Sequence, residues 1–123
     1  MKIAITGHTK GIGKCIKELL EKDGHEVVGA STSTGINVMR PKSVISWIDK
    51  EDPDIFINNV YAPNSQCNIL YKLYEKWQYL DKHIINLSST SGESHTHFQQ
   101  MGFNEHWTPY VSDKARLNFA SQY

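Results

Sequence analysis

The sequence has little cysteine, no long hydrophobic run and no excess of charge of either sign. Its two cysteines, Cys15 and Cys67, lie far apart and form no CxxC pair, which argues against a disulfide framework and against a zinc site. No apolar stretch approaches the roughly 18 residues that span a bilayer, and the apolar run at the amino terminus is too short for a secretory signal. We therefore expect a cytoplasmic protein without a membrane partner.

Charge is balanced. The 13 Lys and Arg residues offset 13 Asp and Glu residues, so the formal net charge is zero. Nonspecific binding of nucleic acid requires a long-range positive field, which this chain lacks, and no nucleic-acid partner is expected. With 123 residues and 39% apolar content, the chain is long enough to bury a real core and predicts a single domain over residues 1–123.

Short β-type runs alternate with stretches of helical period, a pattern typical of βαβ units around a parallel sheet. Strands are predicted at 2–6, 26–31, 36–39, 55–57 and 84–87. Helices are predicted from residue 12 to Gly24, from Pro41 to Pro53, over 65–80, and from Thr108, an expected N-cap followed by Pro109. Cys15 falls in the apolar stripe of the first helix and is expected to be buried.

A glycine-rich segment, Thr6-Gly7-His8-Thr9-Lys10-Gly11-Ile12-Gly13, connects the first predicted strand to the first helix. Glycines let the backbone turn tightly and approach a pyrophosphate without interference from Cβ atoms. The following helix supplies unpaired N–H groups and the positive end of its dipole. In this strand-glycine-helix context the segment predicts a nucleotide site.

Four segments in order resemble the short-chain dehydrogenases/reductases. The glycine segment is similar to the cofactor motif of that family, and 58–61 (Asn-Asn-Val-Tyr) lies where the family has its NNAG motif. The segment 86–92 (Asn-Leu-Ser-Ser-Thr-Ser-Gly) is similar to N-x-S-S-x-x-G, and 110–114 is similar to Y-x-x-x-K. The resemblance implies a Rossmann-like, doubly wound α/β fold. About five parallel strands in the order 3-2-1-4-5 would have helices on both faces, without the family's C-terminal strands.

The resemblance also implies a catalytic set. Tyr110 would exchange a proton with a carbonyl or alcohol oxygen, and Lys114, four residues later on a helix, shares its face and stabilises the phenolate. Ser89 would hydrogen-bond the substrate oxygen, with Ser88 as its neighbouring alternative. The family's fourth residue, an asparagine that helps to hold a relay water, is assigned to Asn68, with Asn64 as the alternative.

The nicotinamide cofactor is expected to be NADP(H) rather than NAD(H). No acidic residue follows the second predicted strand, where NAD users tend to carry one, and Lys10 stands where many NADP-preferring relatives carry a basic residue. Asn37-Val38 resembles the family's Asp-Val pair that contacts adenine. The expected cofactor-binding residues are Gly7, Thr9, Lys10, Gly11, Ile12, Gly13, Ser31, Thr32, Ser33, Asn37, Val38, Asn59, Val60, Tyr110 and Lys114.

The length limits what the resemblance implies, because it covers only the first part of the family's domain. We expect a homodimer or homotetramer through 65–80 and 108–123, which would cover an otherwise bare edge and face. The leading hypothesis is a minimal reductase of small-molecule carbonyls. A nucleotide-binding module or redox sensor without turnover, and a fragment of a longer enzyme, are the alternatives. In the long polar stretch His95, His97 and His106 could partly replace a lid, and no metal site is expected.

Overall fold

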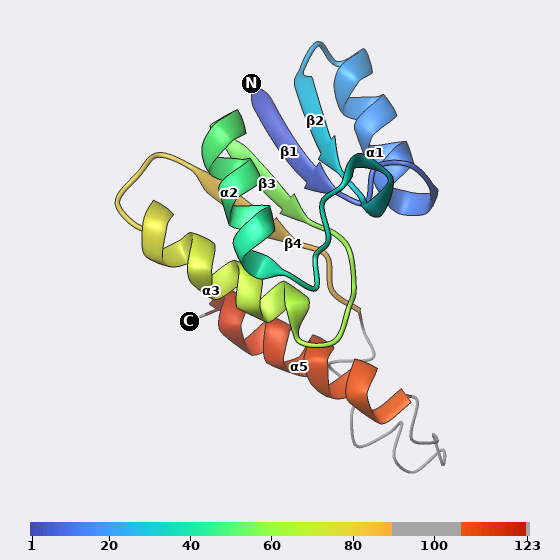
Figure 1. Ribbon diagram of the computed structural model, residues 1–123, viewed down its shortest axis with the longest axis vertical. Helices are drawn as coiled ribbons and strands as arrows, with labels where there is room; N and C mark the ends of the chain where they lie inside the picture. The colour runs from blue at the N-terminus through green and yellow to red at the C-terminus, as the bar shows by residue number, and fades with distance from the viewer. Residues whose placement is uncertain (90–106, 123) are drawn as a thin grey trace.

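In the computed structural model, residues 1–89 and 107–122 are described (Figure 1). Strands and helices alternate along most of the chain, as predicted. In order they are β1 (Lys2–Thr6), α1 (Gly11–Lys22), β2 (Glu26–Ala30), the short 3-10 helix η1 (Thr32–Thr34), α2 (Pro41–Glu51), β3 (Ile55–Asn58), α3 (Ser65–Trp77), β4 (His83–Asn86) and α5 (Trp107–Gln122).

The described residues form a sheet of four parallel strands in the order β2-β1-β3-β4. The predicted Rossmann-like α/β fold is confirmed, but the extra strand predicted at 36–39 is wrong. Asn37 begins a turn there: its side-chain oxygen accepts from the Met39 N–H and its carbonyl oxygen accepts from the Arg40 N–H, both at 2.9 Å. Ile36 and Val38 still pack against the core from this turn. Their apolar spacing therefore reflects burial and not a strand.

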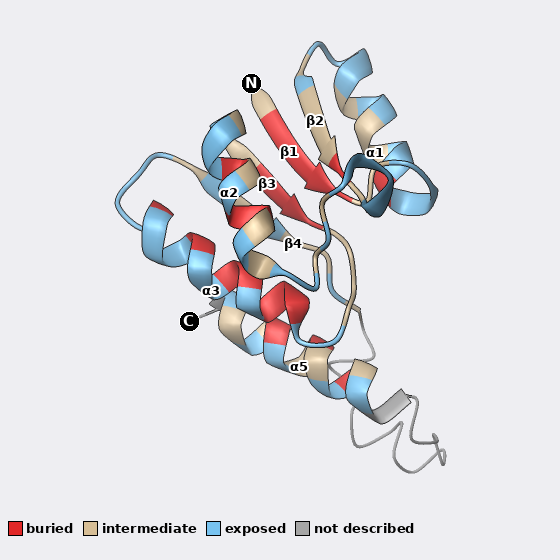
Figure 2. Cartoon of the chain, viewed as in Figure 1, coloured by how far each residue is buried: buried red, intermediate tan, exposed pale blue. Residues whose placement is uncertain are grey.

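The two faces of the sheet have separate cores. Ala4 and Phe56, both fully buried, face α2 and α3, whereas Ile3, Ile5 and Ile57 face α1. Figure 2 shows the buried residues concentrated on β1, β3 and the adjoining faces of α2 and α3. Because successive side chains of a strand point to opposite faces, one short strand serves both cores.

The helix α1 covers its face of the sheet with only part of its apolar stripe. Ile16 and Leu20 pack against the sheet, but Ile12 and Leu19 are 70% and 63% exposed. Cys15 lies on the same outer side and is exposed, so the expectation that it is buried is wrong. The apolar stripe of α1 is therefore wider than the surface that α1 buries against the sheet.

Two helix boundaries also differ from the prediction. Helix α5 begins at Trp107, so Thr108 lies in its first turn instead of capping it, and Pro109 is tolerated there because first-turn N–H groups need no helical partner. Helix α3 ends at Trp77, and Leu80 beyond it is 52% exposed. No helix within the described ranges combines the length and apolarity needed to cross a membrane.

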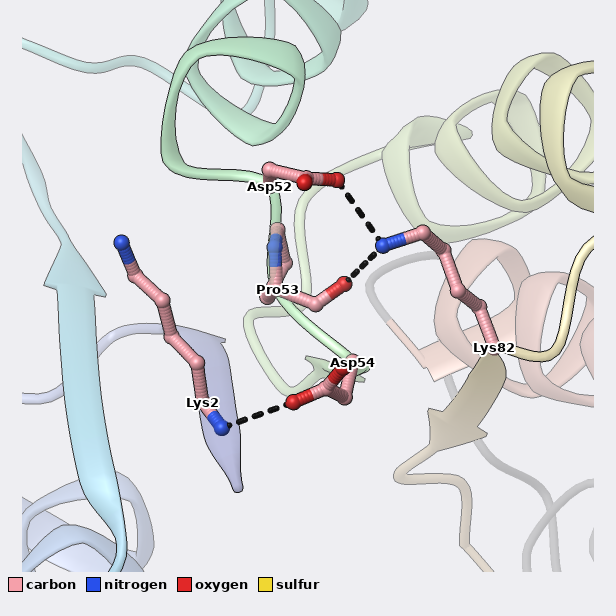
Figure 3. Close-up of polar contacts among 5 residues, drawn as sticks. All are labelled: Lys2, Asp52, Pro53, Asp54 and Lys82. Atoms are coloured by element: carbon pink, nitrogen blue, oxygen red, sulfur yellow. Dashed lines mark hydrogen bonds and ion pairs between the residues drawn. The ribbon is translucent and has the colours of Figure 1, made fainter.

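Polar contacts fix the amino ends of the strands (Figure 3). The backbone N–H of Lys2 donates to the Asp54 carboxylate at 2.9 Å. Lys82, just before β4, donates from Nζ to Asp52 Oδ1 at 2.9 Å and to the carbonyl oxygen of Pro53 at 2.7 Å. These bonds join β1 and β4 to the α2–β3 connection, at the edge of the sheet opposite the carboxyl ends.

Candidate functional site

The candidate site lies at the carboxyl ends of the four strands, where the glycine loop follows β1. From β1 the chain crosses through α1 to β2 on one side, and β3 lies on the other side of β1. The order of strands therefore reverses beside β1. Ligands of open α/β sheets bind in the crevice at such a switch point.

The glycines of the loop are required by its geometry. Gly7 and Gly11 have φ angles of 74° and 63°, in the left-handed region that favours glycine. A Cβ on Gly13 would collide with the carbonyl oxygen of Gly7, so α1 approaches the end of β1 more closely than any other residue would allow. This packing gives the predicted glycine motif a structural reason in this chain.

Residues after β3 support the same loop. The backbone N–H groups of Asn59 and Val60 donate to Thr6 Oγ1 at 3.1 and 3.3 Å. The Asn59 side chain donates from Nδ2 to the carbonyl oxygen of Thr6 at 3.0 Å. Asn59 and Val60, both predicted as cofactor-binding residues, are thus brought to the glycine loop, and Thr6 is the buried acceptor that holds them there.

The start of α1 can receive an anion. The first N–H groups of a helix have no intrahelical partner and carry the positive end of its dipole. Here α1 has no acidic residue in its first turn and no side-chain cap, and Thr9, Lys10, Gly11 and Ile12 are all exposed. The loop and the first turn of α1 together fit a phosphate or pyrophosphate group.

His8 fills the space beside β2. Its imidazole lies where a Cβ on Gly29 would be, and its Nδ1 is buried without a hydrogen-bond partner among the described residues. The prediction did not single out His8. Gly29 in the interior of a strand was the available signal, because such glycines often mark a close approach of another group.

The hydroxyl-rich end of β2 forms a compact turn next to the glycine loop. Ser31 Oγ and Ser33 Oγ share a hydrogen bond of 2.6 Å, and the Ser31 N–H donates to Thr34 Oγ1 at 2.9 Å. The Gly7 N–H donates to the carbonyl oxygen of Ala30 at 2.7 Å, which holds this turn beside the loop. Thr32 and Ser33 are exposed. No carboxylate occurs among residues 31–34.

Asn37 and Val38 stand in the turn before α2. The Asn37 side-chain oxygen is engaged with the Met39 N–H, and Val38 packs against the core on the α2 face. Asn37 itself is exposed.

A second cluster of polar residues surrounds Lys114, which is only 4% exposed. Its Nζ donates to Gln66 Oε1 at 2.7 Å and to the carbonyl oxygen of Leu87 at 3.0 Å. The same ammonium lies 5.6 Å from the ring centroids of both Tyr61 and Tyr110. Burial lowers the pKa of Lys114, opposed by the nearby charge of Asp113.

Tyr61 and Tyr110 form an aromatic pair beside this lysine. Their ring centroids are 4.8 Å apart and the planes meet at 72°, an edge-to-face arrangement. The Tyr61 hydroxyl donates to the Asp113 carboxylate at 3.5 Å. Burial is the main cause that raises the pKa of Tyr61, and the negative charge of Asp113 raises it further. The predicted pair of Tyr110 and Lys114 therefore shares its surroundings with a second tyrosine, which stands where the NNAG motif has glycine.

Gln66 contacts Lys114, whereas Asn68 and Asn64 do not among the described contacts. Two residues apart on a helix, Gln66 and Asn68 point roughly 200° away from each other. Asn68 is exposed and lines a shallow groove with Arg40 and Lys42 at the start of α2. Asn64 is exposed and donates its backbone N–H to Asp113 at 2.9 Å.

Ser88 and Ser89 follow β4. The Ser88 hydroxyl donates to the carbonyl oxygen of Lys114 at 3.5 Å, so this side chain faces α5. Ser89 is partly buried. The predictions for His95, His97 and His106 lie outside the described residues.

Among the comparisons with known proteins, the similarity to solved structures supports the fold. No protein-family model matches the sequence, and no curated protein matches it in sequence. Among solved structures, the chain is similar to a GDP-L-fucose synthetase from Naegleria fowleri, with a TM-score of 0.73 and 14% identity. It is also similar to a 3-alpha-hydroxysteroid dehydrogenase from Pseudomonas sp. B-0831, solved with NADH, with a TM-score of 0.67 and 20% identity.

A third similar structure is a short-chain dehydrogenase/reductase from Burkholderia vietnamiensis, with a TM-score of 0.68 and 14% identity. The similarity extends over 98%, 95% and 98% of this chain, and over 43%, 63% and 77% of the three proteins respectively. This chain thus spans less than two thirds of the length of the first two. The resemblance to short-chain dehydrogenases/reductases predicted from the motifs is therefore confirmed at the level of the fold.

Proposed function

We propose that this chain is a nicotinamide-dependent oxidoreductase that interconverts a small-molecule carbonyl and its alcohol. One observation carries the proposal: the buried Lys114 ammonium lies beside the Tyr110 ring at the sheet edge that also carries the glycine loop. A tyrosine and a lysine that share an exposed helix face by chance would leave the ammonium in solvent, whereas Lys114 is buried. A proton-exchanging phenol next to a nucleotide site is the arrangement that carbonyl reduction requires.

The glycine loop would receive the pyrophosphate of such a cofactor, because the first turn of α1 offers free N–H groups and Gly13 lets this turn lie close to the end of β1. Thr9, Lys10 and Ile12 would line the phosphates, and Asn59 and Val60 would border the crevice. When bound, the nicotinamide supplies the hydride. Lys114, already held beside the Tyr110 ring, would hold the cofactor ribose.

The residues of the chain then supply the proton and the orientation. Tyr110 donates a proton to the carbonyl oxygen during reduction and accepts it during oxidation, and Lys114 stabilises the phenolate between these steps. Ser89 orients the substrate oxygen. The similarity of 86–92 to the N-x-S-S-x-x-G motif supports Ser89 in this role.

The preferred cofactor in this proposal is NADP(H). A 2′-phosphate carries negative charge, and residues 31–34 offer hydroxyls without a carboxylate, next to the exposed Lys10. Asn37 and Val38 would border the adenine. Titration of NADPH and NADH by fluorescence, with tighter binding of NADPH expected, tests this preference.

The decisive experiment combines binding and turnover. After the cofactor titration, a panel of carbonyl substrates is assayed with the wild-type protein and with Tyr110→Phe, which removes only the phenolic oxygen. Turnover that depends on Tyr110 is expected. Cofactor binding without turnover would contradict the enzyme proposal, and no binding of either cofactor would contradict the nucleotide site as well.

A second candidate, a nucleotide-binding module without turnover, is favoured by one observation. The ring of Tyr61 packs against Tyr110, at the position where the NNAG motif has glycine. If this contact excludes substrate, Tyr61→Gly should create or increase turnover. If the wild-type protein already shows turnover, the module proposal fails. In that case Tyr61→Gly should leave the phenol of Tyr110 able to donate its proton.

We also propose that the protein is a homodimer or homotetramer through 65–80 and 108–123. Tyr71 and Tyr74 of α3 and Phe119 of α5 are 50%, 55% and 64% exposed. Large, mainly apolar side chains exposed on both helices are typical of association surfaces. Light scattering should give a mass above 14.0 kDa, and Phe119→Glu should lower it. A stable wild-type monomer would contradict this proposal.

A further inference from the structure

Gln66 is a polar residue within the apolar face of α3. It is 5% exposed and shares its side of the helix with Ile69, Leu70 and Leu73, all buried. Burial of an amide is unfavourable unless its donors and acceptors are paired. The contacts of this side chain therefore explain why a glutamine occupies a core position.

Both ends of the Gln66 amide are bonded. Oε1 accepts from Lys114 Nζ at 2.7 Å, and Nε2 donates to the carbonyl oxygens of Asn58 and Leu87 at 3.0 and 2.8 Å. The reversed amide would place its NH₂ against an ammonium and its oxygen against two carbonyl oxygens. Only the observed orientation of the amide satisfies all three of these partners.

The backbone of Gln66 is anchored to the sheet as well. Asn58 Nδ2 donates to the carbonyl oxygen of Gln66 and to Asn86 Oδ1, both at 2.9 Å. The carbonyl oxygen of Leu87 accepts from Gln66 and from Lys114. One side chain thus connects α3, the ends of β3 and β4, and the lysine of α5.

We propose that Gln66 is the positioning residue of Lys114, a proposal whose catalytic part rests on the function proposed above. With Leu87 it occupies two of the three N–H directions of the ammonium. Among the described contacts this leaves one N–H, which the proposed function assigns to the ribose of the cofactor, while the positive charge itself acts on the nearby phenol of Tyr110. Gln66 fixes where the positive charge of the site lies.

A neutral acceptor has a specific advantage at this position. The groups that face Lys114 are Asp113 on α5, Cys67 on α3 and the two rings of Tyr61 and Tyr110. A carboxylate in place of the Gln66 amide would neutralise the ammonium. The amide holds Lys114 and leaves its positive charge available to the phenolate of Tyr110.

The test measures the titration of Lys114 by NMR on the protein with carbon-13 in its lysine side chains. Gln66→Met keeps the volume but removes the acceptor, and it should lower the pKa of Lys114 further, by about one unit. Gln66→Glu should raise that pKa, because a carboxylate favours the ammonium. Gln78→Met, at an exposed glutamine at the end of the same helix, is the matched control and should leave it unchanged.

Activity gives a second, separate readout. Gln66→Met should lower kcat/KM about ten- to a hundredfold, as expected for loss of a hydrogen bond to a charged group. Gln66→Glu should move the pH profile of alcohol oxidation to higher pH, a change that loss of packing alone would not produce. If Gln66→Met does not fold, Gln66→Glu carries both measurements.

The outcomes separate the two proposals. An unchanged pKa of Lys114 in the Gln66 variants would overturn the positioning role, whether or not the protein is active. A shifted pKa of Lys114 in the Gln66 variants, together with a wild-type protein that shows no turnover, would support the link between Gln66 and Lys114. The same result would overturn the proposed function.

Discussion

Asn59 ties the end of β3 to the end of β1 by donating from Nδ2 to the carbonyl oxygen of Thr6 at 3.0 Å. Its backbone N–H donates to Thr6 Oγ1 at 3.1 Å, so two bonds join residues 53 positions apart. The bonds lie at the switch point of the sheet, where the glycine loop begins. Loop shape is therefore set by contacts between strands as much as by the glycines.

Thr6→Val tests this connection, because valine has nearly the same shape but accepts no hydrogen bond. The N–H groups of Asn59 and Val60 would lose their acceptor, and the free energy of unfolding should fall by about 1–3 kcal/mol. Chemical denaturation measures the change. The same replacement at the exposed Thr9 should change stability little, and equal effects at both positions would contradict the role of Thr6.

Gly13→Ala tests the close approach of α1 to β1. Helix propensity alone predicts that alanine stabilises the helix by about 1 kcal/mol. The contact geometry predicts the opposite, because the new Cβ would meet the carbonyl oxygen of Gly7 and the helix would have to shift. We expect lower stability, by about 1–3 kcal/mol, and weaker binding of NADPH. A variant more stable than the wild type would contradict the packing described.

Local patterns predicted the elements well because each signal lies in a few neighbouring residues. The short apolar run of Ile3, Ala4 and Ile5 and the helical spacing of Ile69, Leu70 and Leu73 correspond to a real strand and a real helix. The failures depend on tertiary contacts. A turn at 37–40 replaces the predicted strand, and the burial of Cys15 depended on how much of α1 the sheet covers.

The site was predictable as far as motifs define it. Tyr110 and Lys114 share a helix face because of their spacing, and the structure places the Lys114 ammonium beside the Tyr110 ring. Gln66 was missed because no motif contains it. Its signal was a polar residue in register with the apolar stripe of α3, four residues before Leu70. Which acceptor reaches Lys114 depends on how α3 and α5 pack, and sequence spacing does not contain that information.

Ser31→Asp tests the proposed cofactor preference. A carboxylate at the end of β2 would repel a 2′-phosphate and could accept hydrogen bonds from an unmodified ribose. NADPH binding should weaken at least about tenfold, a change of about 1.4 kcal/mol, while NADH binding is retained or improved. Fluorescence titration of both cofactors measures the ratio. Ser31→Asn is the uncharged control, and equal losses in the two variants would show that charge is not the cause.

Lys114 gives stability a defined dependence on pH. Burial lowers its pKa in the folded chain, whereas the unfolded lysine titrates near 10.5. Between these two values the unfolded state binds more protons, so the contribution of Lys114 makes the free energy of unfolding rise with pH. Below the folded pKa the lysine is charged in both states and its unfavourable contribution is constant.

Urea denaturation at several pH values below 10 measures this slope in the wild type and in Lys114→Met. The variant should lack the lysine contribution and show the flatter profile. The range ends there because Tyr61, whose pKa is raised from 10.0 by burial, keeps its proton longer in the folded chain and opposes the trend above that pH. Identical slopes in the two proteins would contradict the titration of Lys114 in this range.

Lys82→Met tests the opposite edge of the sheet. The substitution removes the bonds from Nζ to Asp52 and to the carbonyl oxygen of Pro53, and the contact of the ammonium with the Trp77 ring at 5.3 Å. We expect the free energy of unfolding to fall by about 1–2 kcal/mol, chiefly because the carbonyl oxygen of Pro53 loses its donor.

The exposed Lys50 provides the control: Lys50→Met, which breaks no ion pair among the described residues, should change stability by less than about 0.5 kcal/mol. Cofactor binding should remain at the wild-type level in both variants, because these contacts lie at the amino ends of the strands and the glycine loop lies at the carboxyl ends. A loss of NADPH binding in Lys82→Met with only a small loss of stability would show that the two edges are coupled through the sheet. That result would contradict the separation of a stabilising edge from a ligand-binding edge.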